Sequence, residues 1–267
     1  MSREHDGWIV SESGPPDADH AALLLPGALA TAPFYDELLA EPKLGAASIR
    51  FVVTTLPGFG RTPPLDDLSM ENLASRAGKL AADLGCDVVV GHSFGGNVAI
   101  EMVAAGEFSG PVVLLSPSYS RVDESKFLRV LDHMARLLGH LPYAAMLKLV
   151  GTAVKGNLAP ERRKELVAEL KKNDPRFLRR QMRSYLEYLD RHGSLARRLC
   201  DSGVRAWVAF GEYDDIGLTA DEHRVLEDCP HVTVVEIADA GHFTLNEKPG
   251  PVVELVLAAV ETIAPGS

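Results

Sequence analysis

The amino-acid sequence predicts an α/β protein built on a mostly parallel, doubly wound sheet. Short apolar runs rich in β-branched residues alternate with helical patterns, which is typical of successive βαβ units. The runs are apolar throughout, as expected of strands that helices cover on both faces. The chain has 267 residues, of which 46% are hydrophobic and 24% charged. That length allows a sizeable core in one large domain or two small ones.

Turn residues divide the predicted strands from the predicted helices. One helix opens at Ser69 and stops at Gly85, and another stops at Gly106, because glycine commonly follows the last helical residue. The strands are predicted at residues 8–10, 22–25, 49–54, 86–90, 111–115, 204–210 and 232–237, and the helices at 69–84, 97–105, 218–226 and 251–263.

One long segment breaks this alternation and contains almost no β-rich run. Apolar residues at helical spacing predict helices over 127–138 and 161–170 and a third that begins at Pro175. We therefore predict a helical cap of roughly 80 residues, 118–202, inserted into a core formed by residues 1–117 and 203–267. We expect the aromatic residues of the cap to form mostly its own core, with one or two lining a pocket: Phe127, Tyr143, Phe177, Tyr185 and Tyr188.

Charge is unevenly distributed along the chain. The formal net charge is −10, which argues against nucleic acid as a partner. Residues 121–200 carry 18 of the 27 Lys and Arg but 9 of the 37 Asp and Glu, a net of +9, so the remainder carries −19. This pattern predicts a basic cap on an acidic body. The alternative is a basic lid that attracts an anionic substrate, with side chains such as Arg162 and Lys171 free to face solvent or the entrance.

The sequence gives no sign of a membrane or secreted protein. No apolar run approaches the ~18–20 residues of a membrane span, and the polar N-terminus lacks the apolar core of a signal peptide. Cys86, Cys200 and Cys229 lie far apart and form no CxxC pair, so we expect neither a disulfide nor a zinc site. These features favour a cytoplasmic location, with the three cysteines as thiols.

The clearest motif is Gly-His-Ser-Phe-Gly at residues 91–95, a G-x-S-x-G pattern. A buried strand precedes it and a helix follows, which is the context that this motif requires. The sharp turn would expose the Ser93 side chain, and side chains at Gly91 and Gly95 would clash across it. The backbone N–H of Phe94, at the helix N-terminus, would stabilise a developing oxyanion.

A serine hydroxyl needs a base, and His242 is the best candidate. It follows the last predicted strand, and open α/β sheets place their sites at the carboxyl ends of strands. An acid that orients the imidazole is expected after the strand at 204–210. We choose Asp214, with Asp215 and Glu212 as alternatives, because a shift of one residue in the turn exchanges them. His92, inside the motif, is expected to pack rather than react.

The order Ser93, Asp214, His242 and the surrounding motifs resemble the α/β-hydrolase superfamily, in the branch with a helical cap after the sixth strand. The similarity covers the turn at 23–28, Leu-Pro-Gly-Phe-Gly-Arg-Thr at 56–62, the serine turn, the Asp loop and 241–249. Two departures are Pro26-Gly27, where the family often has His-Gly, and Leu56, where it often has Asp. The resemblance implies a second oxyanion donor on the backbone of Ala28, with Leu29 as the alternative.

The resemblance and the candidate residues together imply a serine hydrolase without a cofactor or metal. A small acyl compound, most simply a carboxylic ester, is the expected substrate, cleaved through an acyl-enzyme on Ser93. Alternatives of the same fold are a thioesterase, a lactonase, a carbon–carbon bond hydrolase and a cofactor-free haloperoxidase, because the fold does not determine the substrate. The alternative from another class is a ligand-binding protein on a hydrolase scaffold. The sequence leaves the oligomeric state open.

Overall fold

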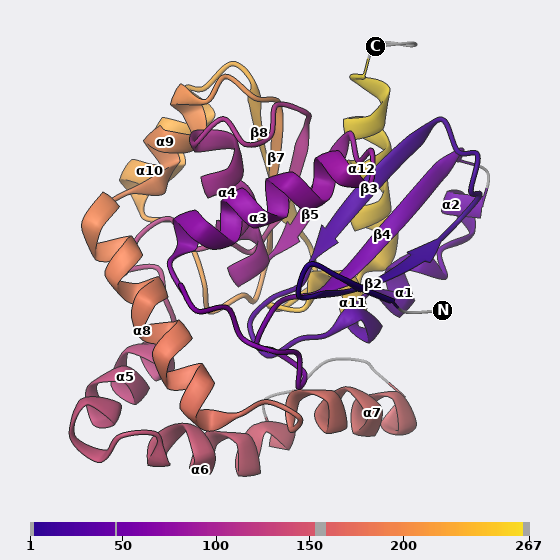
Figure 1. The fold of residues 1–267 in the computed structure, drawn as a ribbon. Helices are drawn as coiled ribbons and strands as arrows, with labels where there is room; N and C mark the ends of the chain where they lie inside the picture. The colour runs from indigo at the N-terminus through magenta and orange to yellow at the C-terminus, as the bar shows by residue number, and fades with distance from the viewer. Residues whose placement is uncertain (1–2, 46, 153–158, 264–267) are drawn as a thin grey trace.

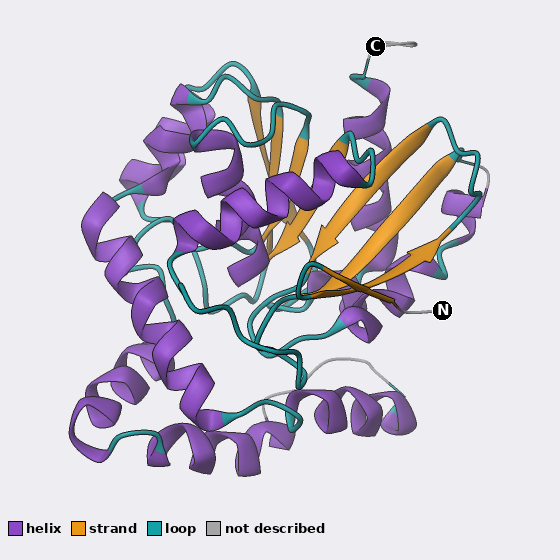
Figure 2. Cartoon of the chain, in the orientation of Figure 1, coloured by secondary structure: helices purple, strands orange, loops and turns teal. Residues whose placement is uncertain are grey.

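The computed structural model describes residues 3–45, 47–152 and 159–263, and its centre is an eight-stranded sheet (Figures 1 and 2). The strand order is β1-β2-β4-β3-β5-β6-β7-β8. β2 pairs antiparallel with β1 and β4, and the other neighbours are parallel. The predicted fold class is therefore confirmed. The strands are β1 (Arg3–His5), β2 (Trp8–Ser13), β3 (His20–Leu25), β4 (Ile49–Thr55), β5 (Val88–His92), β6 (Val112–Leu115), β7 (Ala206–Gly211) and β8 (Val232–Ile237).

The central strands are apolar along their length because helices cover both faces of the sheet. In β3, Leu23 and Leu25 belong to one hydrophobic core and Leu24 to the other, and all three are 0% exposed. Figure 1 shows α3 and α4 on one face and α12 on the other. The helices of the body are η1 (Ala32–Tyr35), α1 (Asp36–Leu39), α2 (Pro42–Gly45), α3 (Met70–Asp83), α4 (Phe94–Ala104), α10 (Ala220–Glu227), α11 (Thr244–Glu247) and α12 (Pro249–Glu261).

A helical segment connects β6 to β7, and residues 118–202 are called the cap segment below. Its described helices are α5 (Lys126–Leu138), α6 (Leu141–Leu149), η2 (Val150–Thr152), α7 (Pro160–Leu170), α8 (Pro175–His192) and α9 (Leu195–Asp201). Residues 153–158 of the predicted cap lie outside the described residues, as do Met1 and Ser2 of the polar N-terminus. In Figure 1, α5, α6 and α7 lie below the sheet, and α8 rises from them to α9. Within the described part of the chain, no helix is long and apolar enough to cross a membrane.

Two helices of the cap segment, α6 and α9, were not predicted from the sequence. α6 follows α5 after only Gly139 and His140, and its sequence is apolar in most directions rather than amphipathic. α9 has seven residues, Leu195–Asp201, which is too short for a helical period to stand out. Both helices therefore depend on packing against their neighbours more than on local pattern.

Four of the five aromatic residues expected to form mostly a core of the cap are buried, but three of them pack on the body instead. Phe177 packs edge-to-face on Phe59 and Tyr185 on Phe94 of the body. The Tyr188 hydroxyl donates to Glu101 of α4 at 2.7 Å. Tyr143, Phe177, Tyr185 and Tyr188 are at most 5% exposed, whereas Phe127 is 60% exposed. Phe127 stays outside the core because it lies in the first turn of α5, and the side of the helix that turns inward carries Leu131 and Ala135. The apolar pattern of α5 is wider than the face that the protein covers.

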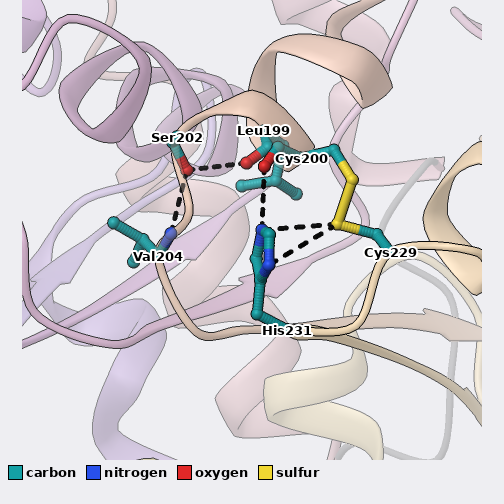
Figure 3. Close-up of a disulfide and its surroundings, with 6 residues drawn as sticks. All are labelled: Leu199, Cys200, Ser202, Val204, Cys229 and His231. Atoms are coloured by element: carbon teal, nitrogen blue, oxygen red, sulfur yellow. Dashed lines mark hydrogen bonds between the residues drawn. A yellow bond between two sulfur atoms is a disulfide. The ribbon is translucent and has the colours of Figure 1, made fainter.

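Cys200 and Cys229 form a disulfide, contrary to the expectation from sequence (Figure 3). Their Cα atoms are 5.9 Å apart although 29 residues separate them in the chain. Cys200 lies in α9 and Cys229 follows α10, and these two helices pack together. Spacing alone gave no signal, because the pairing depends on this tertiary contact. Cys86 is a free, buried thiol.

Removing the disulfide is expected to destabilise the protein. The cross-link closes a loop of 29 residues, so Cys200→Ser/Cys229→Ser should lower the free energy of unfolding by ~3 kcal/mol through the gain of chain entropy in the unfolded state. Denaturant unfolding under non-reducing conditions measures this difference. The single variant Cys86→Ser is the control for loss of a thiol without a cross-link. Equal stability of the double variant and the native chain would show that the bond does not form in solution.

Candidate active site

Ser93 occupies the sharp turn between β5 and α4. Its backbone has φ +50° and ψ −120°, a left-handed conformation that non-glycine residues rarely adopt. The Ser93 N–H donates to the carbonyl of Leu115 at 2.7 Å, and the Ser93 carbonyl accepts from Asn97 N at 3.1 Å. The strained turn is therefore held from the neighbouring strand and from the helix that follows.

Close approach across this turn explains its glycines. A Cβ on Gly91 would lie 2.5 Å from the carbonyl oxygen of Gly95, and a Cβ on Gly95 would lie 2.1 Å from that of Leu25. Gly95 lies in α4 and Leu25 in β3, so neither carbonyl can move without displacing a helix or a strand. The clash inferred from sequence at both positions is thus present in the fold, and the turn after β3 packs directly against the Ser93 turn.

The structure brings Ser93, His242 and Asp214 together from three separate loops. His242 Nε2 lies 3.1 Å from Ser93 Oγ, and His242 Nδ1 lies 3.0 and 3.1 Å from the two carboxylate oxygens of Asp214. The loops follow the carboxyl ends of β5, β7 and β8, which meet at one edge of the sheet. The imidazole thus has one nitrogen toward the hydroxyl and the other toward the carboxylate.

The turn after β7 separates Asp214 from the two alternative acids. The Asp214 side chain is 0% exposed, and its Oδ1 accepts from Ile216 N at 2.9 Å. Asp215 is exposed to solvent, and Glu212 accepts instead from Asp239 N at 2.9 Å. Only Asp214 contacts the imidazole among the three candidates.

Electrostatics couples His242 and Asp214. Burial alone would raise the pKa of Asp214, but the hydrogen bond and charge of His242, with Ser116 and Ile216 N, lower it below its ordinary value. Burial alone would lower the pKa of His242, but the hydrogen bond and charge of Asp214, with smaller contributions from Glu124 and Asp215, raise it above 6.5. The pair thus favours an ionised carboxylate beside an imidazole that accepts a proton readily.

His92 supports the imidazole without titrating. Its Nε2 donates to the carbonyl oxygen of His242 at 2.8 Å, and the two ring centroids are 5.0 Å apart. Burial, with the nearby charge of His242, lowers the pKa of His92 to about 3, so it stays neutral under ordinary conditions. This placement agrees with the packing role expected for it.

The candidate oxyanion donors lie on two adjoining turns. Phe94 N is the first N–H of α4 and has no acceptor within that helix. Ala28 and Leu29 follow β3, and Leu29 has φ +71°, a second strained non-glycine residue beside the site. The choice between Ala28 and Leu29 stays a prediction.

Asn173, between α7 and α8, connects the cap segment by hydrogen bonds to the turn after β3 and to the loop that contains Gly60. Its Nδ2 donates to the carbonyls of Leu29 at 2.8 Å and Leu170 at 2.9 Å, and its Oδ1 accepts from Gly60 N at 3.1 Å. The side chain is 4% exposed. No sequence motif marks this residue, and its two partners in the body, Leu29 and Gly60, are more than 100 positions away in the chain.

Glu124 is a second residue near the site that sequence did not single out. It is 6% exposed, and its Oε1 lies 2.7 Å from both the Ser118 hydroxyl and the Tyr185 hydroxyl. Its negative charge contributes to the raised pKa of His242. Glu124, whose charge acts on His242 from the cap segment, is therefore held in place by two hydrogen bonds.

The sequence matches the model of the alpha/beta hydrolase family over residues 22–255. The chain belongs to this family. No curated protein matches it. The family assignment agrees with the order of the strands and with the resemblance drawn from the motifs.

Solved structures with this hydrolase's fold share little of its sequence. An esterase from Exiguobacterium antarcticum has a TM-score of 0.76 at 14% identity, covering 96% of each chain. An esterase from a Rhodococcus species has a TM-score of 0.74 at 18% identity, covering 98% of each chain. A thioesterase domain from the curacin biosynthetic pathway has a TM-score of 0.70 at 18% identity, covering 96% of this chain and 98% of that one. These similarities establish the fold.

A potential metal-ligand group of this hydrolase lies elsewhere. The ligand atoms of Cys200, Cys229 and His231 lie within 4.8 Å of one another, next to the amino ends of β7 and β8. The two sulfur atoms are bonded to each other, so neither is a thiolate that could bind zinc. His231 Nε2 lies 2.8 Å from the Cys200 carbonyl oxygen (Figure 3). In its oxidised form this group is structural.

Proposed function

We propose that the protein is a serine hydrolase that cleaves a carboxylic ester through an acyl-enzyme on Ser93. The observation that carries the proposal is the continuous contact from Ser93 Oγ through His242 to the buried Asp214 carboxylate. A ligand-binding protein needs no serine whose hydroxyl faces an imidazole oriented by an acid. The strained Ser93 backbone, which costs stability, further supports a role in chemistry.

In the acylation step, Ser93 Oγ attacks the acyl carbon while His242 Nε2 removes the hydroxyl proton. Asp214 stabilises the imidazolium that forms, and its position at Nδ1 fixes the tautomer whose Nε2 is free to act as base. The negative charge on the acyl oxygen is stabilised by Phe94 N–H and by the N–H of Ala28 or Leu29. The leaving alkoxide then takes the proton from Nε2 as the ester bond breaks.

Deacylation repeats these roles with water. His242 removes a proton from a water molecule that attacks the acyl carbon of the ester on Ser93, and the same backbone donors hold the oxyanion. The proton then passes from Nε2 to Ser93 Oγ when the acyl–oxygen bond breaks, which releases the carboxylic acid. No residue beyond those placed at the site is required for either proton transfer.

Two features of the cap segment make an anionic substrate, such as a thioester of an acidic carrier, less favourable than a neutral one. Of the two side chains expected to face solvent or the entrance, Arg162 instead binds Glu37 of the body at 2.5 Å and is 18% exposed, whereas Lys171 is exposed as expected. The cap acid within electrostatic reach of the site, Glu124, is negative. A neutral ester therefore remains the first choice and a thioester the second.

A chain-length series of nitrophenyl esters and matched acyl thioesters tests the substrate class. We expect kcat/KM to be higher for the esters at equal acyl length, and its value to vary little between low salt and ~0.5 M, where charge–charge attraction is screened. A thioester preference that disappears with salt would return the anionic-substrate alternative to first place. Absence of turnover of every member would favour the binding-protein alternative.

The raised pKa of His242 predicts the acid limb of the pH profile. Because the base must be neutral, kcat/KM should fall as pH falls through the pKa of His242 in the free enzyme, with a midpoint above the ordinary value of 6.5. His92, with a pKa near 3, should add no second limb in this range. A midpoint below 6.5 would contradict the coupling to Asp214.

Asn173 is expected to act on catalysis through the position of the turn after β3. Asn173→Asp can still accept from Gly60 N but cannot donate to Leu29 O, so we expect kcat to fall by about tenfold to a hundredfold with a smaller change in KM. The neighbouring surface change Asp174→Asn is the control for the loop between α7 and α8. An unchanged kcat in Asn173→Asp would show that the Leu29 contact does not position an oxyanion donor.

A further inference from the structure

The outer side of α5 and the start of α6 expose large apolar side chains that the protein does not cover. Among the described residues, Tyr213 is the only exposed large hydrophobic residue outside positions 122–149. The outer apolar face is defined here as the following six residues, which are 43–82% exposed: Phe127, Val130, Met134, Leu137, Leu138 and Leu141.

These residues form one continuous surface rather than scattered contacts with solvent. Phe127, Val130 and Met134 follow at intervals of three and four residues, and Leu137 and Leu138 continue the same side of α5. The neighbouring side of α5, where Leu131 and Ala135 are buried, faces inward, and α5 packs on α6 and α8. A helix that is apolar on both its covered and its exposed sides indicates a partner for the exposed side.

The exposed charged side chains of α5 and α6 are all lysine or arginine. Lys126 and Arg136 are exposed on α5, and Lys148 is exposed on α6. Within the described part of the chain, Lys126 and Lys148 have no ion-pair partner, whereas Arg136 pairs with the buried Asp132.

The acids of the same segment are turned inward. Residues 121–149 contain three of them, Asp123, Glu124 and Asp132, and each is at most 7% exposed. Residues 121–149 therefore give the outer apolar face a cationic margin without exposed negative charge. Asp190 of the neighbouring α8 is 53% exposed but pairs with Arg121.

We infer that the outer apolar face binds the surface of an anionic lipid bilayer. A helix with apolar side chains on one side and Lys and Arg beside them lies in the bilayer interface, where burial and attraction to anionic headgroups add. A symmetric second copy fits less well, because it would bring two cationic margins together. An acidic soluble partner would satisfy the charges but would have to supply a matching apolar surface.

The position of this face suits such a contact. Figure 1 shows α5 and α6 at the end of the molecule remote from the sheet, so a bilayer could reach them without meeting the body. The acidic body, which carries most of the negative charge of the chain, would then face away from the anionic surface. Binding in this orientation depends on neither Ser93 nor turnover, so it stands or falls separately from the proposed function.

Vesicle flotation with the full chain tests the inference. We expect the protein to float with vesicles of phosphatidylcholine mixed with phosphatidylglycerol, to float much less with phosphatidylcholine alone, and to be released at ~0.5 M salt. Turnover of a water-soluble nitrophenyl ester is measured on the same samples, because it reports on the active site and not on the outer apolar face.

Three variants separate the contribution of apolar burial to vesicle binding from the contribution of charge. Phe127→Ser/Leu137→Ser should weaken partition to the anionic vesicles at least ~10-fold through loss of apolar burial. Lys126→Glu changes the charge by two units and should weaken it by about tenfold. Arg224→Glu, the same charge change on α10 of the body, where the side chain is 70% exposed, is the matched control and should change partition by less than about twofold. All three should keep the soluble-ester activity and the thermal midpoint of the native chain.

Three results would overturn the inference. The first is no partition to anionic vesicles. The second is equal partition of the native chain and Phe127→Ser/Leu137→Ser. The third is a dimer in sedimentation velocity that becomes a monomer in Phe127→Ser/Leu137→Ser, because a second copy would then cover the face.

Discussion

Replacement of Ser93 with alanine is expected to lower kcat for ester hydrolysis by ~10⁴-fold or more. The variant lacks the oxygen that attacks the acyl carbon, and only binding and oxyanion stabilisation remain to assist direct attack by water. KM should change little, because the hydroxyl contributes mainly to the transition state. Steady-state kinetics with a nitrophenyl ester measures both quantities.

The stability of the Ser93 variants shows whether a loss of activity comes from the missing hydroxyl or from unfolding. Alanine removes a hydroxyl and keeps the Cβ, so the fold of Ser93→Ala should persist. Because Ser93 has φ +50°, Ser93→Gly should be as inactive and no less stable than Ser93→Ala, since glycine adopts this conformation without steric cost. Normal turnover by either variant would remove Ser93 from the mechanism.

Replacement of Asp214 with asparagine is expected to lower kcat by about 10³- to 10⁴-fold. The amide cannot stabilise the imidazolium, and it favours the tautomer whose Nε2 carries the proton and cannot accept one from Ser93. The carboxylate that raises the pKa of His242 is also removed, so the acid limb of the remaining activity should move to lower pH. A full pH profile of kcat/KM measures both effects.

Asp215→Asn is the matched control for this second prediction. Asp215 is exposed and acts on His242 only through its charge, so the expected loss is less than about tenfold because solvent screens it. A greater loss in Asp215→Asn than in Asp214→Asn would show that the turn after β7 adopts another register in solution.

The architecture of the body was predictable because its signals are local. A buried parallel strand is apolar at every position, and turn glycines such as Gly85 and Gly106 mark helix ends. The strand Arg3–His5 was missed because it pairs only at the sheet edge, where its side chains stay partly exposed. The helix expected from Asn97 begins at Phe94, because the Ser93 turn leads into it without a separate cap.

Placement of the three candidate residues followed from sheet topology, since the carboxyl ends of β5, β7 and β8 meet at one edge. The disulfide, the contacts of Asn173 and the exposure of Phe127 depend on tertiary packing, which local sequence patterns do not report. The Cys200–Cys229 bond depends on how α9 meets α10, and Asn173 reaches Leu29 only after the cap segment folds over the body. The exposure of Phe127 similarly depends on which side of α5 turns inward. Apolar spacing predicts a helix but does not determine how much of its apolar side is covered.

Mass spectrometry of the protein after treatment with a fluorophosphonate tests the central claim most directly. Such a reagent phosphonylates a serine whose hydroxyl is activated by a neighbouring base. We predict one adduct per chain, mapped to the peptide that contains Ser93, with labelling lost in Ser93→Ala and strongly slowed in Asp214→Asn. Labelling of another residue, or a native chain that stays unmodified while it hydrolyses nitrophenyl esters, would contradict an acyl-enzyme on Ser93.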